Sequence, residues 1–303
     1  MIRKPHLRLI ALHSVRHGIR GGAGLVAVFM TLVVGLIVSG FLLDTVSAVD
    51  DMADRAEARM HGQFSDADRA RMREKVTQEV IEVGGKAIKW AIEPSDQTLD
   101  YLAVEKPVII SAILVLLMLV TPFLACLAGF NQTAGDIGTK GLRFLLIRTE
   151  RQNIFIGRFL GTMAFSALIY LLLFIIVGIY VIAKVRVHPT GDMLLWWMQG
   201  YLRLMLLTLP YIALCAWVSC SIDSSFGSLV IALLIAYFVP LLVSVGSGIN
   251  SAVKYIGYIT PWGFKYWLLE PLGPKLLGGI AIMVGFTVLL LWAGLRHFSK
   301  RDL

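Results

Sequence analysis

The residue types that most often carry out catalysis are sparse in this sequence, and none of them forms a familiar catalytic pattern. All six histidines lie outside the long apolar stretches, so a serine nucleophile within those stretches would have no histidine base. No His-Glu-x-x-His zinc pair is present. The three cysteines lie inside apolar runs, where we interpret them as small buried hydrophobic residues. The positions are His6, His13, His17, His61, His188 and His297, and Cys126, Cys215 and Cys220.

A phosphate-binding loop of the kind that holds ATP is missing as well. Such a loop requires Gly-x-x-x-x-Gly-Lys followed by Ser or Thr. The nearest candidate, formed by Gly135, Gly138 and Lys140, has the wrong spacing. We therefore expect no cofactor or metal site in this chain and no enzymatic activity of its own.

Long apolar intervals make up most of the chain and must position whatever polar residues act. Of the 303 residues, 57% are hydrophobic and 16% are charged, whereas soluble domains average about 45–50% apolar and about 25% charged residues. This composition excludes a water-soluble globule as the main interpretation.

Six intervals contain no ionisable side chain, and each is long enough to cross a bilayer as a helix. We therefore predict an all-α polytopic membrane protein with six transmembrane helices, none of which has an ionisable residue in its interior. The intervals are Gly21–Leu43, Pro107–Gly135, Phe159–Ala183, Leu204–Ile222, Ser224–Val253 and Leu276–Leu295.

The distribution of basic residues predicts the orientation of these spans. The N-terminal tail has five Lys and Arg residues and no acid, and segment 136–158 has five against two acids. The C-terminal tail has three against one. Because cytoplasmic loops are enriched in Lys and Arg, we place both termini and segment 136–158 in the cytoplasm of a multi-pass plasma (inner) membrane protein. The net charge of +8 is interpreted as this orientation signal and not as a nucleic-acid surface.

The segment before the first span, residues 1–20, predicts an amphipathic helix lying on the cytoplasmic leaflet. One arc of this helix carries most of the basic and histidine side chains, and the opposite arc is apolar, with Arg8 as the exception. A solvated basic tail is the alternative. The polar arc is His6, His13, Arg16, His17 and Arg20, and the apolar arc is Leu7, Ala11, Leu12, Val15 and Ile19.

Two further segments lie outside the spans of the domain formed by residues 21–303. Residues 44–106 show helical spacing of apolar residues over 46–60 and again over 72–90, which predicts a small external helical cap. Residues 255–273 hold six aromatic residues and two prolines, which favours short external re-entrant helices, with a plain aromatic belt as the alternative. A similar external aromatic girdle is expected at 193–201.

Segment 136–158 combines features that a cytoplasmic partner could use. Leu142, Leu145 and Leu146 can lie on one side of a short helix, which leaves Arg143 and Arg151 free on other faces. Asp136 is expected to cap this short helix or to accept hydrogen bonds from amides near its N-terminus. A loop that only sets the membrane topology is the simpler alternative.

The same segment resembles the connection between the second and third helices of ABC-2 type transporter permeases. The resemblance lies in Asp136, Gly138-Thr139, the run Leu142-Arg143-Phe144-Leu145-Leu146, Arg148, Arg151 and Gly157-Arg158-Phe159-Leu160. The C-terminal Phe298-Ser299-Lys300-Arg301-Asp302-Leu303 is similar to a frequent ending in that family. The six-span layout, the N-terminal helix and the large first external loop also fit. Thr149-Glu150 departs from the Pro-x-Ser of many members.

The resemblance implies a permease subunit of an ABC exporter, energised by a separate cytoplasmic ATPase subunit that binds ATP and Mg²⁺. It also implies a second permease subunit, with a homodimer favoured, and contact with membrane lipids. The implied coupling interface is Asp136, Gly138, Arg143, Leu145, Leu146, Arg148 and Arg151. Two alternatives stay open: a non-transporting membrane anchor for a cytoplasmic partner, and an intramembrane hydrolase, against which the missing base and metal residues count.

Overall fold

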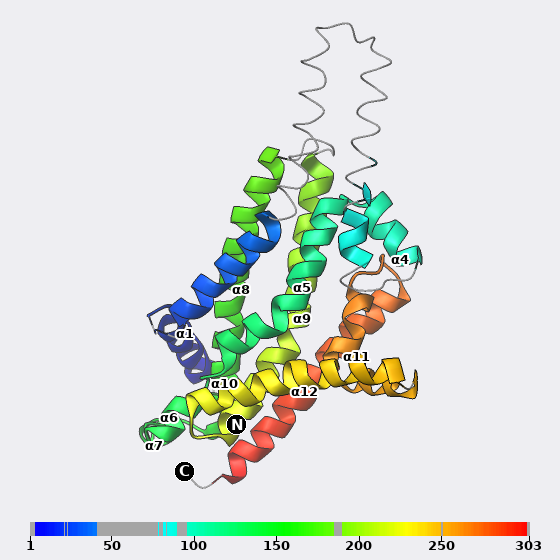
Figure 1. Ribbon diagram of the computed structural model, residues 1–303. Coiled ribbons are helices and arrows are strands. Elements are labelled where there is room, and N and C mark those ends of the chain that lie inside the picture. The colour runs from blue at the N-terminus through cyan, green and yellow to red at the C-terminus, as the bar shows by residue number, and fades with distance from the viewer. Residues whose placement is uncertain are drawn as a thin grey trace, which may run out of the picture.

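The described part of the chain is helical almost throughout and contains no β-strand (Figure 1). The computed structural model describes residues 4–20, 22, 24–40, 78, 81–82, 84–89, 96–184, 190–249 and 251–301. The prediction of an all-α protein is confirmed for these residues. The first predicted helix of the external cap, 46–60, lies outside them, and the second, 72–90, is described only at 78, 81–82 and 84–89, where it is helical.

From α4 onward the described helices follow one another with short connections. The first helix of the chain is α1 (Lys4–Arg20), and residues 24–40 continue as a second helical stretch. The others are α4 (Asp96–Asp100), the π-helical turn η1 (Tyr101–Glu105), α5 (Val108–Gly129), α6 (Ala134–Gly138), α7 (Leu142–Leu146), α8 (Arg151–Lys184), α9 (Thr190–Ser221), α10 (Ser225–Leu233), the π-helical turn η2 (Leu234–Phe238), α11 (Val239–Ile249), the 3₁₀ helices η3 (Ser251–Ile259) and η4 (Pro261–Leu268), and α12 (Pro274–Lys300).

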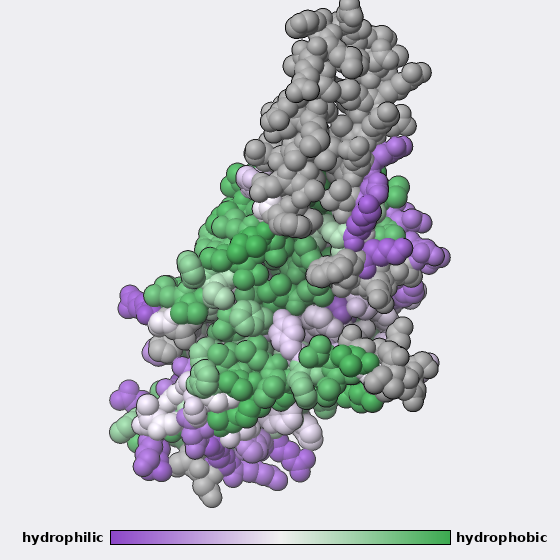
Figure 2. Space-filling model, viewed as in Figure 1, coloured by the Kyte–Doolittle hydropathy of each residue, from purple (hydrophilic) through white to green (hydrophobic). Residues whose placement is uncertain are grey.

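Five helical stretches of the described residues are long and apolar enough to cross a membrane: Val108–Gly138, Arg151–Val181, Gly191–Ser221, Ser225–Val243 and Pro274–Lys300. The pair Leu7–Arg20 and Gly24–Gly40, bent by 67°, provides a sixth if it is one broken span. The architecture is therefore compatible with a multi-pass membrane protein. Figure 2 shows apolar residues over the middle of one face and hydrophilic residues at its lower end, where α6, α7 and the end of α12 lie.

The helices extend beyond the predicted spans free of ionisable residues. Helices α8 and α9 begin well before the predicted Phe159 and Leu204, so their stretches contain Arg158 and Arg203. The first stretch runs on to Gly138 and contains Asp136. A helix can continue through a charged residue because its backbone groups bond to each other within the helix. The charged side chain itself needs a partner or an aromatic ring in the protein interior.

The core of the molecule lies between α5, α8 and α9, whose facing side chains are almost completely buried. Trp196 and Trp197, predicted to form an external girdle, are only 2% and 6% exposed. The indole of Trp196 donates to Ser111 Oγ at 3.0 Å, and that of Trp197 donates to the carbonyl of Phe174 at 2.8 Å. The girdle prediction fails because both polar indole groups find hydrogen-bond partners inside the bundle.

Local signals explain where two of the later helices begin. The hydroxyl of Ser224 accepts a hydrogen bond from the amide of Gly227 at 3.2 Å and so caps the N-terminus of α10. Pro274 is the first residue of α12, where its missing N–H has no intrahelical partner to lose. The close approach of α9 and α12 depends on Gly294, where a Cβ atom would lie 3.1 Å from Trp217 Cα.

Helix α1 packs directly on α8 across two glycines. A Cβ atom on Gly157 would lie 2.8 Å from Ile10 Cγ2, and one on Gly161 would lie 2.6 Å from the carbonyl oxygen of Ala11. This Gly-x-x-x-Gly spacing lets the two backbones come close. The predicted helix is confirmed, but its buried face contains Ile10 and Ser14, whereas Leu12, from the predicted apolar arc, is 48% exposed.

Helix α5 carries a proline in its interior, and a tyrosine from another helix compensates for it. Pro122 has no N–H to donate within the helix. The Tyr237 hydroxyl donates to the carbonyl of Leu119 at 3.1 Å and accepts from the amide of Phe123 at 3.0 Å. In a regular α-helix these two backbone groups would bond to each other. Tyr237 lies in the π-helical turn η2, so this turn contacts α5 next to its internal proline.

Candidate functional site

The short helices α6 and α7 stand out at one end of the molecule, beside the start of α10 and the end of α12 (Figure 1). Two backbone features shape this connection. A Cβ atom on Gly138 would lie 2.4 Å from the carbonyl oxygen of Asp223, so only glycine fits there. Lys140, with φ 58°, is the one non-glycine residue with positive φ in the described chain, and it separates α6 from α7.

One side of α7 is held by a small hydrophobic cluster at this end. Leu142 is 1% exposed, and Leu146, one turn later, packs partly against the same cluster. The cluster consists of Leu142, Ile154, Phe155, Ala216, Cys220 and Phe298, so it connects α7 to α8, α9 and α12. The prediction that Leu142 and Leu146 share a face is confirmed, but Leu145 points elsewhere and is 38% exposed.

The opposite side of α7 is apolar and exposed. Phe144 is 75% exposed and Ile147 is 82% exposed, and Leu145 lies between them in sequence. Arg143 and Arg148 are exposed on either side. We call Arg143, Phe144, Leu145, Ile147 and Arg148 the tip surface. Sequence reasoning missed Phe144 and Ile147, although their spacing of three residues, out of step with the buried Leu142 and Leu146, was a usable signal.

Asp136 pairs with Arg158, which the sequence analysis did not place in the site. Arg158 donates from Nη2 to Asp136 Oδ2 and from Nη1 to the carbonyl of Gln132. The Arg158 side chain is only 16% exposed, so the carboxylate supplies the counter-charge that a buried guanidinium needs. The predicted capping role of Asp136 is not seen, since the N-cap of α6 is Thr133, without a side-chain cap bond.

Arg151 is not free, contrary to the prediction. Its Nη1 donates to the carbonyl oxygens of Phe298, Ser299 and Arg301 at 3.1, 3.0 and 2.6 Å. The last carbonyls of a helix have no intrahelical donors, and a cation there also complements the helix dipole. Arg151 therefore fastens the C-terminal end of α12 to the first turn of α8.

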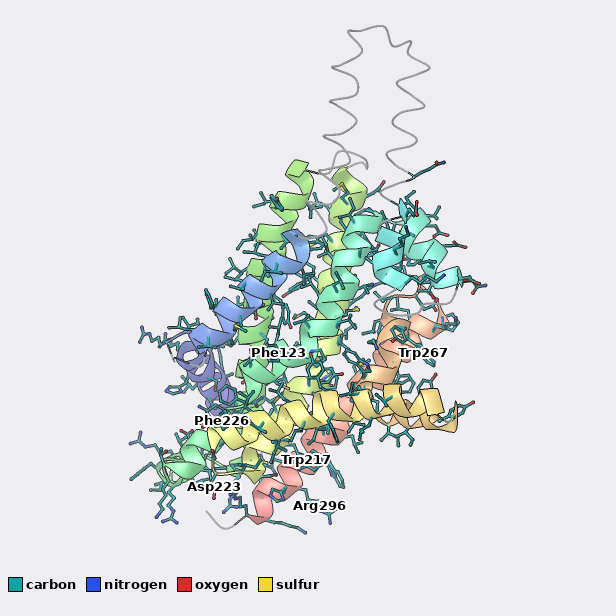
Figure 3. The ribbon with its side chains drawn as sticks, viewed as in Figure 1. Phe123, Trp217, Asp223, Phe226, Trp267 and Arg296 are labelled. Atoms are coloured by element: carbon teal, nitrogen blue, oxygen red, sulfur yellow. The ribbon has the colours of Figure 1, made fainter. Side chains whose placement is uncertain are left out.

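A second arginine fastens the same end to the turn between α9 and α10. Arg301 donates to Asp223 Oδ1 and to the carbonyl of Cys220. Figure 3 shows Asp223 at this end of the molecule, with Trp217 further along α9. Gly138, Lys140, Arg143, Asp223 and Arg301 line a shallow pocket behind the tip surface. Of the predicted interface residues, Gly138 and Arg143 thus lie together, Asp136 faces Arg158, and Arg148 remains exposed.

Far along α9 from this end lies a buried arginine that the sequence analysis took as a span boundary. Arg203 is 5% exposed, and its guanidinium carbon lies 4.6 Å from the centre of the Trp196 ring. The Lys106 amine lies 5.6 Å from the same ring centre. Among the described residues, Nη1 of Arg203 has no hydrogen-bond partner. The Trp196 ring and the side chain of Tyr101 are the local groups that offset its burial.

No group of three or more His, Cys, Asp or Glu side chains that could hold a metal ion occurs in the part of the chain that the structure describes. Comparison with known proteins adds no further constraint, because neither a family model nor a curated protein matches this sequence.

Proposed function

We propose that this chain is a permease subunit of an ATP-driven exporter of the ABC-2 type, and that a separate cytoplasmic ATPase subunit docks on the tip surface. The observation that carries the proposal is the exposure of Phe144 and Ile147 on a short helix whose other side is fixed in a hydrophobic cluster. Large apolar side chains rimmed by arginines are typical of protein-binding surfaces.

The way in which the tip surface is anchored supports a role in transmitting motion. Leu142 and Leu146 fix α7 on the cluster, and the Asp136–Arg158 pair joins α6 to α8. A displacement of the tip surface would therefore be transmitted through these contacts to the long apolar helix α8. This favours a coupling element over a loop that only sets topology.

A second permease subunit is part of the proposal, because two long helices are poorly covered within one chain. Only 17% of the most apolar part of Ser225–Val243 and 22% of that of Pro274–Lys300 are buried, against 78% for Val108–Gly138. Exposed apolar residues on these helices include Phe226, Phe238, Leu242, Val288 and Trp292. A second copy and membrane lipids would share these faces, with the homodimer as the first expectation.

The proposal is tested by purifying the tagged chain from its native membrane and measuring the ATPase that accompanies it. Phe144→Asp and Ile147→Asp should abolish co-purification of the ATPase, because each places a charge where the partner needs an apolar contact. Leu272→Asp is the matched control, since Leu272 is 86% exposed but lies far along the chain from the tip surface. Equal ATPase recovery from all three variants would contradict the docking assignment.

The same preparation separates a transporter from a non-transporting anchor. A permease should change the rate of ATP hydrolysis when it is reconstituted in vesicles with its ATPase, whereas an anchor should bind the ATPase and leave its turnover unchanged. The chain alone should hydrolyse no ATP, and turnover by this chain in the absence of any other protein would contradict the proposal.

A further inference from the structure

The shallow pocket behind the tip surface is rich in basic side chains. It has a volume of about 240 Å³ and opens between α6, α7, the turn before α10 and the residue that follows α12. One water molecule takes up about 30 Å³ in the liquid, so the pocket has room for a phosphate-sized group. Its charged lining is Lys140, Arg143, Asp223 and Arg301, and Ile137, Gly138 and Leu142 complete it.

The charges of this pocket are not balanced within the chain. The guanidinium of Arg301 already donates to Asp223 Oδ1 and to the carbonyl of Cys220. The side chains of Lys140 and Arg143 are exposed, and neither makes a hydrogen bond or an ion pair with a residue that the structure describes. Two cations of the lining are therefore without a counter-charge and within reach of a ligand. This excess favours an anion.

The end of α12 indicates the depth at which the pocket lies. Trp292 is 57% exposed, and the guanidinium carbon of Arg296 lies 5.4 Å from the centre of its ring. Exposed tryptophans beside basic residues are typical of the boundary between a membrane and water. Arg301 follows Arg296 by five residues, a rise of about 7.5 Å along a helix. The headgroup layer on each side of a bilayer is about 5–7.5 Å thick, so the pocket lies at the depth of phospholipid headgroups.

An exposed apolar stripe starts beside the pocket. Phe226 comes three residues after Asp223 and is 74% exposed. Val230 and Leu234 follow at intervals of four residues and are 39% and 50% exposed, so the three side chains lie on one side of the helix. Figure 3 shows Asp223, Phe226 and Arg296 in the lower part of the view. A basic pocket that continues into an apolar stripe matches the two halves of a phospholipid.

We propose that this pocket binds the phosphate of an anionic phospholipid of the phosphatidylglycerol type, whose acyl chains lie along the stripe. Lysine and arginine donate charge-assisted hydrogen bonds to phosphate oxygens, and basic pockets at the membrane surface bind anionic headgroups. An acidic side chain of a partner protein would also meet the two cations, but it would not account for the apolar stripe. The inference is independent of the proposed transport function.

Lipid retention by the chain without its ATPase provides the test. The full-length chain is purified into nanodiscs of phosphatidylcholine doped with phosphatidylglycerol, and native mass spectrometry counts the lipids that stay bound. We expect phosphatidylglycerol to be retained at least about tenfold better than phosphatidylcholine. This preference should shrink as the ionic strength of the wash is raised. Equal retention of the two lipids overturns the proposal. Displacement by soluble glycerophosphoglycerol at matched concentration would overturn the lipid as the source of the phosphate.

Two double variants of equal charge locate the effect. Lys140→Gln/Arg143→Gln removes the unpaired cations and should abolish the preference for phosphatidylglycerol. Arg148→Gln/Lys300→Gln is the matched control, because both residues are exposed at the same end of the molecule but do not line the pocket. Unfolding temperatures verify that both variants are folded. Survival of the preference in the first variant, or its loss in the control, overturns the assignment. A first variant that keeps the lipid but recovers less ATPase would assign the pocket to the ATPase and contradict the lipid proposal.

Discussion

At the scale of single residues, the pairing of Asp136 with Arg158 changes what a substitution should do. The expected effect of Asp136→Ala on a helix cap is about 1 kcal/mol. Removing one partner of a buried ion pair is more costly, because it leaves the other charge without compensation. The Arg158 side chain is 16% exposed, so this second situation applies.

We expect Asp136→Ala to lower the free energy of unfolding by about 3 kcal/mol. The double variant Asp136→Ala/Arg158→Met should recover part of this loss, since it removes both charges. Thermal unfolding in detergent of Asp136→Ala, Arg158→Met and the double variant gives the coupling energy directly. A loss of only about 1 kcal/mol with no recovery in the double variant would show that the pair contributes little.

Lys265 provides a second prediction at this scale, through the pH dependence of stability. It is 3% exposed, its amine lies 3.9 Å from the Trp262 ring centre and 4.1 Å from that of Tyr266, and no ion pair of Lys265 occurs among the described residues. Burial lowers the pKa of Lys265 to about 7. The unfolded chain, with a pKa near 10.4, therefore binds more protons between these values.

Stability should consequently rise as the pH increases from about 7 toward 10, and the penalty for burying the charged amine should be complete below pH 7. Lys265→Met should remove this rise and should stabilise the protein most at acidic pH. Unfolding temperatures of both proteins at pH 6 and pH 9 test this. The same pH response in both would mean that another group is responsible.

At the scale of elements, the contact between η2 and the proline-containing part of α5 is a specific joint between two helices. Tyr237→Phe removes the hydroxyl that serves Leu119 and Phe123, and should cost about 2 kcal/mol because two partly buried backbone groups lose a partner. Tyr211→Phe is the matched control: its hydroxyl is buried without a partner among the described residues, so its loss should be neutral. Hydrogen exchange at the Phe123 amide should accelerate only in Tyr237→Phe.

The sequence predicted the elements better than their ends or their contacts. The period and length of apolar residues are local properties, so the long helices and the existence of α1 could be found from sequence alone, whereas the face of α1 that packs on α8 could not. The start of α9 at Thr190 could not be found from sequence alone. The first part of this helix packs through hydrogen bonds that Trp196 and Trp197 make with distant helices. The role of Arg151 was likewise hidden, since its partners lie at the end of α12, far along the chain.

At the scale of the whole molecule, several contacts gather the tip surface, the end of α12 and the turn before α10 at one end (Figure 3). With the basic residues of the N-terminus and of segment 136–158, this predicts that both chain ends lie in the cytoplasm. Reporter fusions at Arg3 and after Leu303 should read cytoplasmic, and an insertion near Phe64 should read external. An external C-terminus would break the six-span arrangement.

The packing of α1 on Gly157 and Gly161 has a consequence for how the protein is made. The ribosome completes α1 long before it reaches α8, so the surface on which α1 finally packs does not yet exist when α1 emerges. During that interval the face of α1 that finally packs on α8, which contains Ile10 and Ser14, can be covered only by lipid or by a chaperone. Its docking onto α8 is therefore a late event in biogenesis, and a chain truncated before Gly161 would leave the N-terminal helix without its partner.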